Sequence, residues 1–223
     1  MKIKTLWERC FSINSQFCDA VVSCGYLSFE QMVSAAIRYR LGATLQRGVI
    51  FWQIDHEERI HDGKVMYYSS DCHRMKDKLH SPTWVSFLLA RRESRPKGSY
   101  TSSHCLFGLH LLRESDGDVA LVESEKTAFV MSEIHPQYIW LASGGLSELQ
   151  PYKFRPLRGR RVILFPDTDP DGTAYRRWND ISTEVMASSF WEGSPPIRVS
   201  PCLEQKASPD QKSRKIDILD FHF

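Results

Sequence analysis

Three aspartates at alternate positions are the residues of this sequence best placed to do chemistry. Asp167, Asp169 and Asp171 follow the apolar run 162–165 and come just before Gly172 and a helix-like segment. A run of four apolar residues is typical of a strand that is buried on both faces in a parallel sheet. Carboxylates at the end of such a strand face the crevice where open α/β sheets bind ligands. This loop is therefore the first candidate for a functional site.

Three interpretations of the loop follow from the residues alone. A calcium loop of the EF-hand type needs a glutamate at its twelfth position, where this sequence has Trp178. A phosphatase of the haloacid dehalogenase type also places D-x-D after a strand, but Pro166 intervenes and Asp171 replaces the expected threonine. An acidic turn could instead cap the next helix and favour its positive end, although one aspartate would be enough.

A second acidic position lies upstream and favours a metal site. The apolar run 119–122 ends in Glu123, and residues 125–133 can form a helix. If both strands are parallel neighbours, Glu123 and the aspartates of the later loop meet at one sheet edge. Carboxylate oxygens of this kind hold Mg²⁺, which usually shares them with substrate phosphates.

Three stretches of the sequence then resemble the signatures of a Toprim domain, which bacterial primases, topoisomerases and some nucleases share. Residues 122–128 read Val-Glu-Ser-Glu-Lys-Thr-Ala, residues 143–145 read Ser-Gly-Gly, and residues 165–172 read Phe-Pro-Asp-Thr-Asp-Pro-Asp-Gly. The likeness is greatest to an uncharacterised group of primase-like Toprim proteins on plasmids, phages and other bacterial mobile elements. It departs at Ser124, where the family usually has glycine. It is strong over residues 105–200 and weaker over 48–100.

The pattern of elements agrees with this likeness. From residue 105 onward, strands at 119–123, 138–142, 161–165 and 197–199 alternate with helices at 125–133 and 173–188, which predicts an α/β fold with a parallel sheet. The resemblance implies a Rossmann-like Toprim domain with four parallel strands and helices on both faces. It also implies a small α+β primase-like subdomain before it. The expected domains are residues 1–100 and residues 101–223, the second including a C-terminal tail.

The resemblance assigns roles to the acidic residues. Asp167 and Asp169 would ligate Mg²⁺ or Mn²⁺, and Glu123 would complete the site or act as general base. Asp171 would be either an extra ligand or the N-cap of the following helix.

Phosphate-binding roles fall on other residues. Lys126 could meet a phosphate or be a surface lysine, and Arg176 and Arg177 could approach the substrate or pair with the acidic site. Gly144 and Gly145 would let the backbone approach a nucleotide or turn tightly. Lys64 lies on an expected strand, where it could face the active-site cleft or be a solvated edge-strand residue.

The N-terminal region reads as a helix followed by a hairpin. Ser28 and Gln31 form a capping-box signature, followed by an apolar stripe of helical period that runs from Phe29 to Ile37. Residues 48–55 and 63–68 are rich in β-branched and aromatic residues, which predicts a β-hairpin. Basic residues between 74 and 97 suit contacts with a phosphate backbone, and residues 91–100 are the best linker candidate.

Composition sets the remaining limits. The chain has 223 residues, 42% of them hydrophobic, and a net charge of +2, so it can bury a core but has no global affinity for polyanions. No apolar run approaches the roughly 20 residues of a membrane span, and we expect a cytoplasmic protein without membrane contact.

The spacing of Cys10, Cys18 and Cys24 does not match that of a zinc ribbon. The polar segment 201–215 predicts a mobile tail, and residues 216–220 resemble the segment that closes primase Toprim domains.

These observations lead to one main hypothesis and two alternatives. The main hypothesis is metal-dependent nucleotidyl transfer on a nucleic acid template, in DNA replication or in mobilisation of a mobile element. Its expected partners are DNA or RNA, nucleotides and a helicase or another replication protein. A Toprim nuclease would use the same carboxylates to cut a phosphodiester. A non-catalytic nucleic-acid or replication-partner module would keep the acidic residues only as part of the fold.

Overall fold

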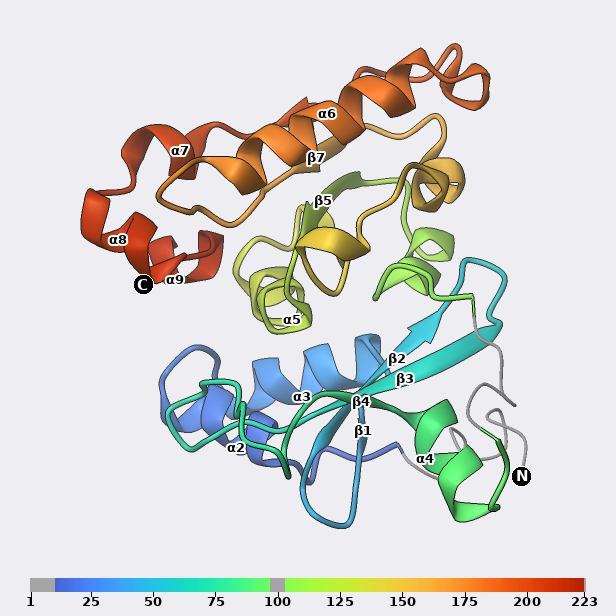
Figure 1. Cartoon of the computed structure of the whole chain (residues 1–223), viewed down its shortest axis with the longest axis vertical. Helices are drawn as coiled ribbons and strands as arrows, with labels where there is room; N and C mark the ends of the chain where they lie inside the picture. Colours follow the sequence, from blue (N-terminus) through green and yellow to red (C-terminus); the bar gives the residue numbers. More distant parts are fainter. Residues whose placement is uncertain (1–10, 97–102, 223) are drawn as a thin grey trace. The chain divides into compact units, whose positions relative to one another are not determined.

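The computed structural model describes residues 11–96 and 103–222. It divides into two compact units, an N-terminal unit Met1–Leu111 and a C-terminal unit Leu112–Phe223. The expected domain boundary between residues 100 and 101 lies outside the described residues. Each unit contains one four-stranded sheet (Figure 1).

The N-terminal unit is built on an antiparallel sheet with the strand order β1-β2-β3-β4. Its strands are β1 (Gly42–Ala43), β2 (Val49–Ile54), β3 (Ile60–Met66) and β4 (Thr83–Trp84). Its helices are α2 (Gln16–Ser23), α3 (Phe29–Arg38) and α4 (Val85–Arg92), and the 3-10 helix η1 (Leu109–Arg113) crosses the boundary. All six residues of β2 are buried, as its β-branched and aromatic composition favours.

The predicted hairpin is present, and one carboxylate organises its turn. Asp55 Oδ1 accepts the backbone N–H groups of Glu57 at 2.8 Å and Arg59 at 3.0 Å, while Oδ2 accepts Arg59 Nε at 2.8 Å. This side chain satisfies the polar groups of the turn and lets β3 begin at Ile60, three residues earlier than we expected.

Helix α3 confirms its predicted cap but only part of its predicted packing face. The Ser28 hydroxyl accepts the Gln31 N–H at 3.2 Å, and the Gln31 side chain accepts the Ser28 N–H at 2.9 Å. Met32 and Ala36 are buried as expected, but Phe29 and Ile37 are 57% and 59% exposed. The expected stripe is therefore wrong at its two ends, because Ala35 takes part in the packing face instead.

The C-terminal unit is built on a parallel sheet with the strand order β6-β5-β7-β8. Its strands are β5 (Asp118–Val122), β6 (Tyr138–Ala142), β7 (Val162–Leu164) and β8 (Arg198–Val199). Its helices are α5 (Glu125–Ile134), α6 (Thr173–Ala187), α7 (Cys202–Lys206), α8 (Pro209–Arg214) and α9 (Ile218–His222). The 3-10 helices are η2 (Leu146–Glu148), η3 (Pro151–Leu157) and η4 (Ser189–Trp191). The predicted α/β class and parallel four-stranded sheet are confirmed.

The strand order creates a switch point at the centre of this sheet. The connection through α5 leads from β5 to β6 on one side, whereas α6 leads from β7 to β8 on the other. Right-handed crossovers in opposite directions place their helices on opposite faces, and Figure 1 shows β5 and β7 between α5 and α6. The residues that follow β5 and β7 thus lie where doubly wound sheets open a crevice.

The C-terminal segment differs from the mobile tail that its polar composition predicts. Residues 202–206 and 209–214 form α7 and α8. Ser208 and Gln211 make a reciprocal capping box at the start of α8, and Lys212 Nζ contacts Glu204 Oε1 at 2.8 Å. These local hydrogen bonds and the ion pair stabilise helices that have few apolar residues to bury. Composition alone does not reveal such contacts, so it predicted a mobile tail.

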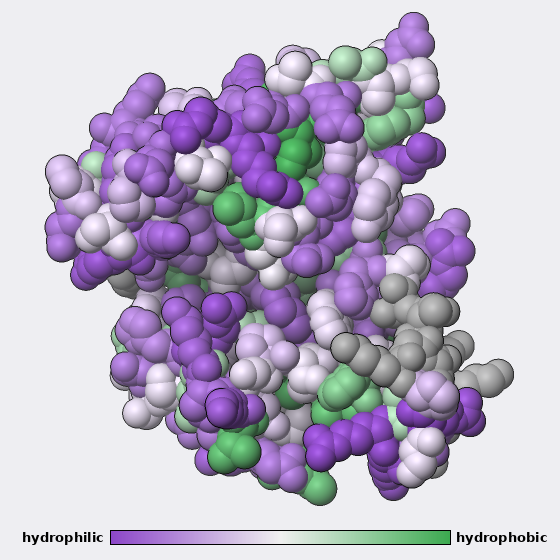
Figure 2. All heavy atoms as spheres, viewed as in Figure 1, coloured by the Kyte–Doolittle hydropathy of each residue, from purple (hydrophilic) through white to green (hydrophobic). Residues whose placement is uncertain are grey.

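Most of the face visible in Figure 2 is hydrophilic, as expected of side chains in contact with water. Among the described residues, no helix combines the length and the apolar composition needed to cross a bilayer.

Cys18 is buried, which raises the pKa of its thiol to about 11, and Cys24 is exposed. Cys10, the third cysteine considered above, lies outside the described residues.

Candidate carboxylate site

Glu123 and Asp167 lie at the carboxyl ends of the two central strands. Leu121 of β5 is paired with Leu164 of β7, so Glu123 comes two residues after one partner and Asp167 three residues after the other. The backbone N–H of Asp167 interacts with the Glu123 carboxylate. The sequence prediction that these acidic positions meet at one sheet edge is therefore confirmed.

Both carboxyl groups are held in an environment that disfavours two negative charges. Burial raises the pKa of Glu123 to about 7, with further increases from the charges of Asp169 and Asp217. Burial, followed by the charge of Glu123, raises the pKa of Asp167 well above its usual value. Glu123 Oε1 and Asp167 Oδ1 are buried and accept no hydrogen bond. The site is thus a pair of acids with unsatisfied oxygens, which is costly without a proton or a cation.

Asp169 is engaged in a different way, because its carboxylate caps α6. Oδ1 accepts the N–H groups of Asp171 and Thr173, each at 3.0 Å, and Oδ2 accepts that of Ala174 at 2.7 Å. Burial alone would raise the pKa of Asp169, but these three donors hold it below its usual value. Capping therefore accounts for both oxygens of a residue that the sequence assigned to the metal.

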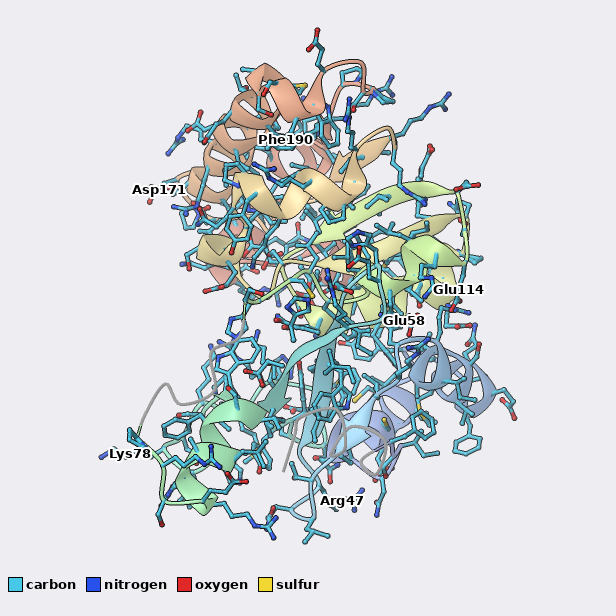
Figure 3. The ribbon with its side chains drawn as sticks, turned by 90° about the vertical axis from the view of Figure 1, so that its right-hand side faces the viewer. Arg47, Glu58, Lys78, Glu114, Asp171 and Phe190 are labelled. Atoms are coloured by element: carbon cyan, nitrogen blue, oxygen red, sulfur yellow. The ribbon has the colours of Figure 1, made fainter. Side chains whose placement is uncertain are left out.

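Asp171 and Arg176 form the outer part of the same loop. Asp171 is exposed at the edge of the unit (Figure 3). The N-cap position that the sequence offered it is held by Gly172, and the carboxylate that accepts the first N–H groups of α6 is that of Asp169. Arg176 Nη1 donates to the backbone carbonyl of Asp171 at 2.6 Å, and Gly172 turns the chain with a φ of 65°. Arg176 thus closes the loop, and its predicted phosphate contact stays a prediction.

The predicted glycine turn sits directly against the glutamate. Gly144 and Gly145 have φ values of 90° and 147°, which other residues rarely adopt. The Gly144 N–H donates to the Glu123 carbonyl at 2.9 Å. Ser124, in contrast, has an ordinary extended conformation with φ −96°, so this position does not require the glycine usual in Toprim sequences.

The C-terminal segment brings two further carboxylates to the site, Asp217 and Asp220, which were not among the predicted ligands. The Thr127 hydroxyl on α5 donates to Asp217 Oδ2, and the Thr168 N–H donates to the Ile216 carbonyl at 2.9 Å. Burial and then the charge of Asp220 raise the pKa of Asp217. The predicted closing segment is therefore anchored to α5 and to the loop after β7.

Three basic residues, two on helices and one just after α8, act on these carboxylates. Lys126 on α5 acts on Asp167, Arg177 on α6 acts on Glu123, and Lys215 acts on Asp169. Lys126 was predicted from the sequence, and Arg177 was named with Arg176 as able to approach the substrate or pair with the acidic site, whereas Lys215 was not predicted. Arg177 could have been chosen over Arg176 from helix periodicity, because it lies closer to the buried face formed by Ala174, Trp178 and Ile181.

Comparison with known proteins gives the chain a family. The family model described as Domain of unknown function (DUF6371) matches residues 15–168, which is more than half of the chain. The chain belongs to the DUF6371 family. The matched range includes Glu123 and Asp167 and ends one residue before Asp169.

This DUF6371 protein was also compared with curated proteins and with solved structures. No curated protein matches it. Among solved structures, it is similar to the primase fragment of the bacteriophage T7 primase-helicase protein, with 16% sequence identity and a TM-score of 0.47. The similarity covers 74% of the DUF6371 chain and 59% of that fragment.

The donor set of the DUF6371 protein fits a hard divalent cation bound through two carboxylates. In the part of the chain that the structure describes, no three His, Cys, Asp or Glu residues are arranged to hold a metal ion. Mg²⁺ commonly binds through one or two carboxylates and takes its other ligands from water and substrate phosphates. The free buried oxygens of Glu123 and Asp167 match that requirement.

Lys64, the remaining predicted site residue, belongs to the N-terminal unit. It lies on β3, opposite Phe51 of β2 and Trp84 of β4, and is only 9% exposed. The expectation of a solvated lysine on an edge strand is therefore wrong, because β4 covers that edge. Its phosphate-binding role stays a prediction.

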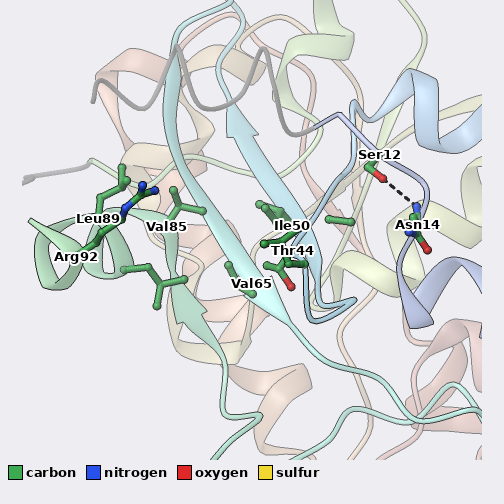
Figure 4. Close-up of a pocket in the computed structure, with 11 residues that line it drawn as sticks. Ser12, Asn14, Thr44, Ile50, Val65, Val85, Leu89 and Arg92 are labelled. Atoms are coloured by element: carbon green, nitrogen blue, oxygen red, sulfur yellow. Dashed lines mark hydrogen bonds between the residues drawn. The ribbon is translucent and has the colours of Figure 1, made fainter.

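The N-terminal unit also has a cavity of about 450 Å³ between its sheet and α4. Ile50, Val65, Val85 and Leu89 form an apolar part of its lining, and Arg92 adds a charge (Figure 4). The volume is in the range of small-molecule pockets. The described residues around it do not include the acids or histidines that could carry out a reaction.

Proposed function

We propose that this DUF6371 protein binds a divalent cation through Glu123 and Asp167 and uses it in nucleotidyl transfer on a nucleic acid. The observation that supports this proposal most directly is the pair of buried carboxyls with unpartnered oxygens at the switch point of the sheet. The Toprim-like segments 122–128, 143–145 and 165–172 supply the reaction class. The partners would be a DNA or RNA template, nucleotides and a helicase or other replication protein.

The residues of the site would divide the work between them. Glu123 and Asp167 share a site that does not easily hold two negative charges, so a cation bound by both carboxylates would displace a proton from the pair. Mg²⁺ or Mn²⁺, when bound, would neutralise the charge that develops on a phosphate. Gly144 and Gly145 would let the backbone approach a ligand, and Lys126 supplies positive charge that acts on Asp167.

The first test is Mn²⁺ binding measured by calorimetry on the full chain. We expect wild-type binding that is lost in Glu123→Gln and Asp167→Asn, because each removes one anionic oxygen donor. Asp171→Asn is the matched control, since its carboxyl is exposed on the same loop. Asp169→Ala is a poorer test because it also removes the cap of α6. Wild-type protein that does not bind Mn²⁺ would exclude the proposal.

Template-dependent synthesis then distinguishes the reaction from its alternative. Nucleoside triphosphates and single-stranded DNA with Mg²⁺ should give extended products that Glu123→Gln does not make. A Toprim-type nuclease would instead shorten labelled single- or double-stranded DNA under the same conditions.

The hydrogen bonds of Asp169 favour a second candidate, a non-catalytic binding module, because both carboxylate oxygens accept backbone N–H groups of the fold. That module would bind DNA equally well in wild type and Asp167→Asn and would show neither activity.

A further inference from the structure

Lys215 occupies a backbone conformation that usually selects glycine. It follows the last residue of α8 with φ 56° and ψ 53°, in the left-handed region. Glycine is the commonest residue at this place after a helix because it has no Cβ to clash. Another L-residue is disfavoured there, because its Cβ lies too close to the following carbonyl oxygen. A lysine therefore stands where the backbone does not favour one.

The chain that follows Lys215 is fixed to the carboxylate site. The Ile216 carbonyl accepts the Thr168 N–H at 2.9 Å, and Asp217 is bonded to Thr127. These bonds hold Lys215 next to the loop that connects β7 to α6. Its positive charge acts on Asp169 of that loop.

The neighbouring basic residues are engaged elsewhere, whereas Lys215 is available. Lys212 Nζ pairs with Glu204 at 2.8 Å, and Arg214 Nε pairs with Asp210 at 3.5 Å. Lys215 is exposed, and among the described residues its ammonium group makes no hydrogen bond or ion pair. A ligand at the carboxylate site could therefore reach it.

We propose that Lys215 binds a phosphate group of the nucleotide that occupies the carboxylate site. This inference rests on the proposed function, because a cation held by Glu123 and Asp167 would take phosphate oxygens among its remaining ligands. The buried, unpartnered oxygen of Glu123 is an independent sign that this site takes a ligand. A lysine ammonium is a compact charge that commonly binds phosphate. The geometry gives this role to a residue on the C-terminal segment.

The decisive variant is Lys215→Gly, because it relieves the backbone and removes the charge together. We expect it to bind Mn²⁺ alone like wild type but to bind ATP, in the presence of Mn²⁺, about tenfold more weakly. Inorganic tripolyphosphate should show the same loss, since the contact is to phosphate. The melting temperature should be equal to or above that of wild type.

Two further variants serve as controls. Lys215→Arg keeps the charge and should stay within about threefold of the wild-type affinity for ATP. Arg214→Ala removes an adjacent positive charge that is already paired and should leave both affinities unchanged.

The results of these experiments distinguish failure of this inference from failure of the proposed function. If wild type does not bind Mn²⁺, the proposed function is wrong and the role of Lys215 is excluded with it. If Mn²⁺ and ATP both bind and Lys215→Gly matches wild type, only the role of Lys215 is wrong. If Lys215→Gly loses stability or Mn²⁺ binding, the residue acts on the fold, and this also overturns the inference.

Discussion

The Asp169 carboxylate accepts three backbone N–H groups at the start of α6. These hydrogen bonds give Asp169 an effect on folding that can be measured without any ligand. We predict that Asp169→Ala lowers the free energy of unfolding by about 1–2 kcal/mol, as loss of a helix cap does. Asp171→Ala, two residues away and exposed, should change it by less than about 0.5 kcal/mol. Urea unfolding of the full chain measures both, and equal effects would contradict the capping role.

At the same scale, residue type and spacing predicted which acids meet but not what each one does. Glu123 and Asp167 could be placed together because each follows an apolar run, and both runs became central strands. Which of three alternate aspartates caps the helix depends on the path of residues 166–172, and the spacing does not encode that path. Asp217 was in a recognised segment, but its partner Thr127 lies 90 positions away.

At the scale of elements, one buried hydroxyl on α5 is hydrogen-bonded to the residue that precedes α9. Thr127 is fully buried and donates to Asp217 Oδ2, whose other oxygen accepts the N–H groups of Leu219 and Asp220. We predict that Thr127→Val lowers the free energy of unfolding by about 1–3 kcal/mol, because it leaves a buried acceptor without its donor. Hydrogen exchange within residues 216–222 should become faster.

Thr127→Ser provides the matched control for that prediction. It keeps the donor and loses one methyl group, so its exchange rates in residues 216–222 should stay close to wild type. If Thr127→Ser accelerates exchange as much as Thr127→Val does, packing of the methyl group rather than the hydrogen bond anchors α9.

Elements with a strong local signal were the predictable ones. The strands at 119–123 and 138–142 and the capping box of Ser28 are set by neighbouring residues, and they agree with the structure within a residue or two. The ends of α3 and the short helices α7 and α8 were not predicted. Whether these residues are helical or buried depends on contacts such as the ion pair of Lys212 with Glu204. The local pattern of apolar residues does not contain that information.

At the scale of the whole molecule, each unit has its own sheet and its own buried side chains, so unfolding need not be a single transition. The N-terminal unit contains a fully buried carboxylate, Asp62, that joins β3 to α4. Its Oδ1 accepts the N–H groups of Gly63 at 2.8 Å and Ser86 at 3.0 Å, and its Oδ2 accepts the Ser86 hydroxyl at 2.5 Å. His104 Nε2 lies 3.6 Å from Oδ2.

These contacts predict how acid affects the N-terminal unit. Burial alone would raise the pKa of Asp62, but His104 and the Ser86 and Gly63 donors hold it below its usual value. The folded pKa is therefore lower than the unfolded one. Its contribution to stability is complete above the unfolded pKa of about 4 and is lost as the pH falls through the folded value.

Asp62→Asn tests this sign directly. At pH 7 it should lower the free energy of unfolding of the N-terminal unit by about 1–3 kcal/mol, because a neutral amide is a weaker acceptor for three donors. Below about pH 4 the difference from wild type should shrink, since the unfolded wild-type chain then takes up a proton and this favours unfolding until the folded carboxylate is protonated as well. Denaturant titrations between pH 3 and 7 measure it, with exposed Asp180→Asn as control. A difference that stays constant across this range would mean that the shape of the side chain, and not its charge, joins β3 to α4.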